Sequence, residues 1–130
     1  MNILILNRRT TVVVFYLYKE GVTHMYGALD IAKYVITKCT KDKHPISNLQ
    51  LQKILYYIQR ELLQQGLAGF SDDMEAWQFG PVAPAVYRQY CGFGAMPIRM
   101  QYNVKIEQDY VKLIVPIIER KRQLNPWDMV

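Results

Sequence analysis

The sequence has few of the residues that most often carry covalent or metal-dependent chemistry. Its 130 residues include two serines, two histidines and two cysteines. Neither serine lies in a G-x-S-x-G frame, and no histidines or cysteines have the spacing of a zinc site. We therefore expect no catalytic residue, no bound metal and no cofactor, and we expect that the protein is not an enzyme.

Long apolar runs and dense clusters of one charge are also missing. The longest apolar run, residues 12–18, is far shorter than the roughly 20 residues that a membrane-spanning helix needs. The net charge is +5, with 16 basic and 11 acidic residues, but the basic residues are scattered. Their nearest approach to a cluster is Lys38, Lys41 and Lys43, which Asp42 interrupts. This pattern favours a cytoplasmic protein that binds no membrane, and it makes nucleic acid an unfavoured partner.

The cysteines and the acidic residues each allow two interpretations. Cys39 and Cys91 do not form a C-x-x-C pair. Two buried, reduced thiols in a cytosolic protein are favoured over a single disulfide. Asp72, Asp73 and Glu75 form the one acidic cluster, for which a solvated turn is favoured over a divalent cation site.

Apolar residues make up 51% of the chain, and their spacing is mainly helical. The pattern predicts helices over residues 27–39, 47–65, 85–90 and 107–123. Ser47 and Gln50 have the spacing of a capping box, and Gly66 is expected to end that helix. Pro116 is expected to kink or split the last helix. Residues 74–79 and 100–106 are expected to be extended or irregular, so the fold class is mostly α, a compact helical domain with a minor short-strand component.

Residues 1–24 differ from the rest of the chain, and three interpretations are open. The β-prone run over residues 12–18 suggests a strand pair. Arg8 and Arg9 before that run suggest a secretory leader, although no A-x-A cleavage site follows. The third interpretation, that residues 1–24 lie upstream of a true start at Met25, is favoured. We accordingly divide the chain into an N-terminal extension, 1–24, and one domain, 25–130.

An aromatic segment stands out at residues 76–82, with the sequence A-W-Q-F-G-P-V. Trp77 and Tyr87 could be core residues whose polar atoms reach the rim, or they could line an exposed binding groove. Residue type alone favours the core.

This segment and the helix before it resemble the Panacea domain family, which occurs in SocA-like antitoxins and phage-associated GepA-type proteins. Residues 49–57, L-Q-L-Q-K-I-L-Y-Y, are similar to the family's L-x-L-Q-K-L-L-Y-Y helix. Residues 75–82, E-A-W-Q-F-G-P-V, are similar to its E-A-W-x-y-G-P-V motif. Residues 86–88 and 28–34 also match family segments. The resemblance is good over residues 26–98 and loose over 107–130.

The resemblance implies an antitoxin of a toxin–antitoxin system, a prophage or another mobile element. Such a protein would neutralise a cognate toxin by direct contact, and the SocA type also presents its toxin to the ClpXP protease. The alternative is a small DNA-associated regulator of a mobile element, and homo-oligomer formation is left open. The family motifs indicate a partner-binding neighbourhood formed by Lys53, Tyr57, Trp77, Phe79, Gly80, Pro81, Tyr87, Arg88 and Tyr90.

The chain departs from the family at both ends. Residues 1–24 have no family counterpart. Residues 125–128, N-P-W-D, have the pattern of a helix start, but the chain stops at Val130, where the family continues with a further helix. We therefore expect that the domain is truncated or divergent at its C-terminus.

Overall fold

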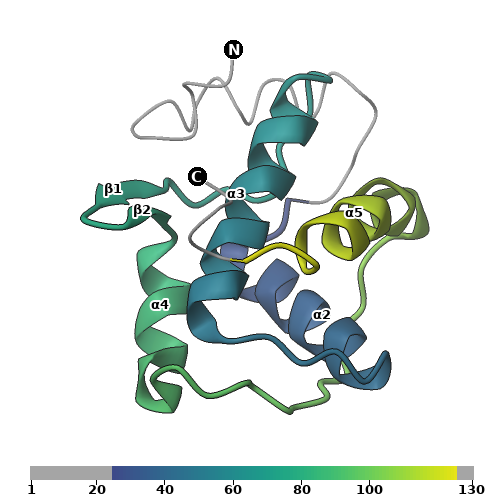
Figure 1. Ribbon diagram of the computed structural model, residues 1–130. Coiled ribbons are helices and arrows are strands. Elements are labelled where there is room, and N and C mark those ends of the chain that lie inside the picture. Colours follow the sequence, from purple (N-terminus) through teal and green to yellow (C-terminus); the bar gives the residue numbers. More distant parts are fainter. Residues whose placement is uncertain (1–24, 126–130) are drawn as a thin grey trace.

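The computed structural model describes residues 25–125, which form four α-helices and one small β-hairpin (Figure 1). The elements follow the chain in the order α2 (Ala28–Lys41), α3 (Asn48–Leu63), β1 (Glu75–Trp77), β2 (Gly80–Val82), α4 (Pro84–Tyr90), the 3-10 helix η2 (Cys91–Phe93) and α5 (Gln108–Lys121). The mostly helical fold class with a minor strand component is confirmed. Our expectations for residues 1–24 and for the helix start at 125–128 lie wholly or largely outside the described residues.

Helix α3 is the centre of the fold, and it contacts α2, α4, α5 and the strand β2 (Figure 1). One stripe of its side chains, including Leu51, Leu55, Ile58 and Leu62, is fully buried. Burying one leucine or isoleucine side chain contributes about 1.5–3 kcal/mol relative to leaving it in water. The helices therefore assemble around α3 because it supplies the largest continuous apolar stripe.

Local sequence signals fix the ends of α3, whereas a distant contact caps the start of α2. The Ser47 hydroxyl accepts the Gln50 N–H at 3.2 Å, and the Gln50 amide oxygen accepts the Ser47 N–H at 3.0 Å, which confirms the capping box. Helix α3 ends at Leu63, two residues before the predicted end, in a turn that reaches Gly66 at φ 83°. Helix α2 is capped from a distant loop, since the Ala28 N–H donates to the Asp72 carboxylate at 2.9 Å.

Ion pairs join α5 to the other helices. Arg120 makes a two-pronged contact with the Glu61 carboxylate of α3, at 2.7 and 2.8 Å. Lys38 of α2 lies 3.0 Å from Glu119 of α5. Beyond the end of α5, Arg122 lies 2.7 Å from Asp42. Hydrogen bonding to Arg122 and to Lys38 lowers the pKa of Asp42.

Two expectations need correction. Of the two effects expected of Pro116, the split does not occur: α5 is continuous, and Pro116 lies inside it on the exposed side, where the carbonyl that loses its partner can be hydrated. Cys91 is exposed, so the prediction of two buried thiols is wrong for this residue. It holds for Cys39, and both cysteines are free. No helix within residues 25–125 has the length and apolar character to cross a membrane.

Candidate functional site

The aromatic segment forms a tight hairpin. Strands β1 and β2 are antiparallel, with Ala76 opposite Pro81, so that Gln78 and Phe79 alone connect them. Gly80 has φ 119°, a conformation that other residues rarely adopt, which explains why glycine ends the connection. Pro81 is tolerated because the sheet has only two strands and its backbone nitrogen need not donate. The Gly80-Pro81 pair, a combination typical of turns, thus starts a strand.

A buried lysine of α3 binds the backbone of the turn in this hairpin. The Lys53 ammonium donates a hydrogen bond to the Phe79 carbonyl oxygen. Lys53 is only 2% exposed, and its burial lowers the pKa of the ammonium. A buried charge is expensive unless a polar group compensates it, and the Phe79 carbonyl is such a group. The two family motifs therefore meet in space at this contact.

Two further polar side chains of α3 hold the start of α4. The Gln52 amide oxygen accepts the Ala83 N–H at 2.9 Å, and the Gln52 amide NH₂ donates to the Asn48 amide oxygen at 3.0 Å. Asn48 in turn donates to the Tyr87 carbonyl oxygen at 3.3 Å. Gln52 is 1% exposed and Asn48 is 3% exposed. The backbone of the hairpin and of α4 is therefore fixed by a row of buried polar groups, which we call the α3 clamp: Asn48, Gln52 and Lys53.

The aromatic side chains of the hairpin point outward from this clamp. Trp77 is 39% exposed, Phe79 57% and Tyr87 36%. The Trp77 and Tyr87 rings pack edge to face, with centroids 5.1 Å apart, and the Trp77 indole N–H donates to Glu75 at 2.9 Å. The core interpretation of Trp77 and Tyr87 is therefore wrong. We call these three aromatic residues and the exposed Arg88 the hairpin surface: Trp77, Phe79, Tyr87 and Arg88.

The remaining predicted site residues do not belong to this exposed group. Tyr90 is 1% exposed and donates its hydroxyl to Tyr102 at 2.9 Å; burial and this contact raise the pKa of Tyr90. Tyr57 is half-buried, and the Lys121 ammonium lies 4.1 Å from the centre of its ring. Lys53 and Tyr90 thus support the surface from inside, and Gly80 and Pro81 shape its backbone.

Sequence reasoning missed five residues that matter here. Asn48 and Gln52 are four residues apart on α3, among buried apolar residues. Polar residues at such positions need buried hydrogen-bond partners, and this requirement could have identified them from the sequence. Phe93, Met96 and Met100 are 36%, 64% and 38% exposed. No pattern in the sequence marked them as surface residues, because an apolar residue in an irregular segment is as compatible with the core.

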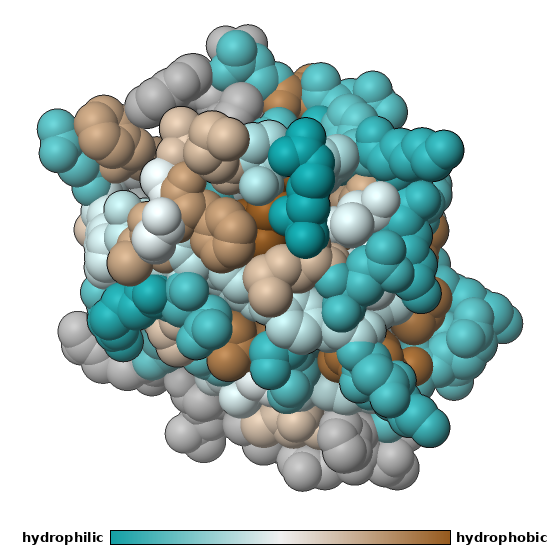
Figure 2. All heavy atoms as spheres, turned by 90° about the horizontal axis from the view of Figure 1, so that it is seen from below, coloured by the Kyte–Doolittle hydropathy of each residue, from teal (hydrophilic) through white to brown (hydrophobic). Residues whose placement is uncertain are grey.

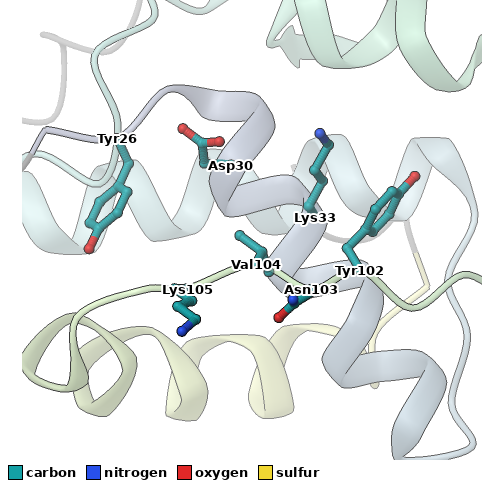
Figure 3. A pocket seen from close by; sticks show the side chains of 7 residues that line it. All are labelled: Tyr26, Asp30, Lys33, Tyr102, Asn103, Val104 and Lys105. Atoms are coloured by element: carbon teal, nitrogen blue, oxygen red, sulfur yellow. The ribbon is translucent and has the colours of Figure 1, made fainter.

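A shallow hollow of about 340 Å³ lies elsewhere, between α2 and the segment over residues 102–105 (Figure 3). The Lys33 ammonium lies 5.4 Å from the Tyr102 ring centre. The Asp30 carboxylate accepts the Gly27 N–H at 3.2 Å. In Figure 3 the charged ends of Asp30 and Lys33 point to the top of the view and that of Lys105 points to the bottom, so the three do not converge on one ligand position.

The acidic cluster does not gather around a metal position. Asp72 caps α2, and Glu75 accepts the indole N–H of Trp77. Over residues 25–125, no three histidine, cysteine or acidic side chains are close enough together to hold a metal ion.

Comparisons with known proteins agree with the resemblance. The family model described as antitoxin SocA-like, Panacea domain, matches residues 51–129, more than half of the chain. Antitoxin SocA of Caulobacter vibrioides (strain NA1000 / CB15N) is 42% identical over 65 residues, which are 49% of this chain and 35% of that protein. The matched part of the chain thus spans about a third of the length of this relative. No solved structure matches the chain.

Proposed function

The chain belongs to the antitoxin SocA-like, Panacea domain family, and on that premise we propose that it is an antitoxin that neutralises a partner toxin by direct contact. The proposed contact region is the hairpin surface. The proposed mechanism is stoichiometric: bound antitoxin covers the toxin, and no catalytic step is needed.

One observation carries this proposal: exposed aromatic side chains project from a backbone that buried groups hold in place. Phe79 is 57% exposed, while its own carbonyl oxygen is bound by the buried Lys53. Aromatic residues and arginine contribute most of the binding energy in many protein interfaces. A fixed backbone lowers the entropy lost on binding, so such side chains contribute more of their contact energy to affinity.

The direct test is co-expression with the product of the adjacent gene. We expect the neighbour to arrest growth alone and this chain to restore growth. Trp77→Ala and Phe79→Ser should weaken the rescue, because both remove exposed aromatic contact area. Leu124→Ser is a matched control, since Leu124 is an exposed apolar residue (41%) outside the hairpin surface, and it should leave the rescue intact.

Two results would contradict the proposal. The first is a neighbour that is harmless alone or stays toxic in the presence of this chain. The second is a rescue that Trp77→Ala, Phe79→Ser and Leu124→Ser all leave unchanged, which would locate the contact elsewhere.

A role as a proteolytic adaptor would add a second step to the same contact. In that case the bound toxin would be delivered to a ClpXP-type protease. The toxin's half-life separates the two mechanisms: it should fall when this chain is co-expressed and recover in a strain that lacks the protease. An unchanged half-life with full rescue favours masking alone.

The alternative function is that of a small DNA-associated regulator, which the pI near 9.2 favours. A protein that contacts several phosphates loses affinity steeply as salt rises. Binding to random duplex DNA, measured over a range of salt concentrations, tests this function. A steep slope would support it, and weak binding with a flat response would leave the antitoxin proposal as the better one.

A further inference from the structure

The region around the hairpin has an unusual charge composition. Residues 76–106 contain three basic residues, Arg88, Arg99 and Lys105, and no aspartate or glutamate. These 31 residues hold none of the chain's 11 acidic groups. All three basic side chains are exposed. A protein surface built from this stretch carries only positive charge of its own.

The same stretch carries most of the exposed large apolar side chains found within residues 25–125. Within residues 25–125, the exposed large apolar side chains other than Leu124 all lie between residues 77 and 100. Three belong to the hairpin surface, and three follow α4: Phe93, Met96 and Met100. We call this second group the distal subsite. Figure 2 shows the face below α4, where apolar side chains lie at the surface among hydrophilic ones.

The backbone that carries the distal subsite is anchored to α2 and to the segment just before α3. The Ile98 N–H donates to the Ile46 carbonyl at 2.8 Å, and the Tyr102 N–H donates to the Thr37 hydroxyl at 2.8 Å. The buried Tyr90 ring lies 6.2 Å from the Phe93 ring, centre to centre. The segment is irregular but pinned, so its exposed side chains have defined positions.

We propose that the hairpin surface and the distal subsite together bind an acidic, amphipathic segment of a partner protein. The inference rests on the proposed function and names the chemistry of the partner. The apolar side chains at the two ends of α4 would take apolar residues, and Arg88 and Arg99 would attract carboxylates between or beside them. Methionine adapts its shape to many apolar partners, which suits a surface of this kind.

Charge complementarity favours an acidic protein segment over a nucleic acid. Three basic residues in 31 are fewer than the dense basic stripe of most nucleic-acid-binding surfaces. Exposed methionines make apolar contacts and offer no charge to phosphate. Glu75 and Glu107 flank the stretch in the sequence, and the Glu75 carboxylate accepts the indole N–H of Trp77 at 2.9 Å.

Binding of two labelled amphipathic peptides tests the proposal by fluorescence anisotropy on the full chain. One peptide places glutamate and leucine at helical spacing, and the other replaces each glutamate by lysine. At an ionic strength of about 0.05 M, where charges are weakly screened, we expect the glutamate peptide to bind about tenfold more tightly. Arg88→Glu/Arg99→Glu should reverse the preference.

Three variants make the test specific. Met96→Gln removes the most exposed apolar side chain of the distal subsite and should weaken binding of the glutamate peptide by about threefold to tenfold. Lys41→Glu/Lys112→Glu makes the same charge change at two exposed lysines outside the stretch and should shift affinity by less than about twofold. Circular dichroism checks that each variant is folded. Because Met96 is 64% exposed, its replacement is expected to fold normally.

Equal affinity for the two peptides overturns the inference, as does a charge reversal at Arg88 and Arg99 that has no more effect than the lysine control. Displacement of the glutamate peptide by single-stranded or duplex DNA at lower concentration also overturns it. The toxin rescue separates this outcome from the proposed function. A rescue that depends on Phe79 but not on the arginines keeps the function and rejects the acidic partner, whereas peptide binding without any rescue rejects the function.

Discussion

The α3 clamp makes a quantitative prediction about the replacement of Gln52 by methionine, which has a similar size and shape but lacks the amide. The substitution removes the acceptor of the Ala83 N–H and the donor to the Asn48 amide oxygen. Ala83 is fully buried, so water cannot replace the lost partner without entering the core. An unsatisfied buried polar group costs about 1–3 kcal/mol, so two such groups predict a loss of about 2–6 kcal/mol in the free energy of unfolding.

Urea denaturation followed by circular dichroism measures this loss. At a slope of about 2 kcal/mol per molar urea, the middle of the range for small proteins, the midpoint should fall by about 1–3 M. Amide hydrogen exchange adds a local measurement. If the hairpin and α4 open before the rest of the domain, the Ala83 amide, which donates to Gln52, should lose more protection from exchange than the amides in the middle of α2.

Gln89→Met is the matched control, because Gln89 is an exposed residue of α4. Surface substitutions of this kind usually change stability by less than about 0.5 kcal/mol. If Gln52→Met lowered stability by no more than Gln89→Met, the clamp would not hold the hairpin, and the rigid-backbone argument for the aromatic surface would fail with it.

Three other substitutions have expected effects on stability. Burial lowers the pKa of Lys53, so the folded state resists its charge. The stability of the wild type relative to Lys53→Met should therefore rise between neutral pH and the ordinary lysine pKa of 10.5, measured by urea midpoints at both ends of this range. Hydrogen bonding to Arg122 lowers the pKa of Asp42, but solvent screens this pair. Asp42→Asn should therefore lower the free energy of unfolding by less than about 1 kcal/mol near neutral pH, and the difference should vanish as the pH falls below the pKa of the folded carboxyl. Tyr110→Phe removes the buried hydroxyl that donates to the Ala68 carbonyl and should cost about 1–3 kcal/mol in the same assay, whereas a neutral result would show that this bond adds no net stability.

The parts of the fold that the sequence predicts are those governed by local rules. The Ser47–Gln50 capping box and the apolar stripe after it place α3 within two residues, because both signals act within a few residues of chain. Helix α4 begins at Pro84, one residue before the predicted start at 85, and proline fits the first turn of a helix. Segment 100–106 is irregular as predicted.

The parts that the sequence does not predict depend on distant contacts. Gly80 and Pro81 act as a break in local terms, yet Gly80 supplies the positive φ that lets β2 fold back on β1. Lys53 carries a charge and is therefore expected at the surface, yet a carbonyl 26 residues away compensates its burial. Trp77 is large and apolar and is therefore expected in the core, yet the whole of β1 is exposed.

These placements divide the family motifs into two physical roles. The polar residues Gln52 and Lys53 are buried and hold backbone atoms, while the aromatic residues Trp77 and Phe79 are exposed. Substitutions of the two kinds should therefore differ even where both abolish toxin rescue. A Gln52 variant should lose rescue together with its urea midpoint, because the surface loses its frame. A Phe79 variant should lose rescue while its urea midpoint stays unchanged. A loss of rescue together with a lower midpoint would mean that Phe79 also stabilises the fold.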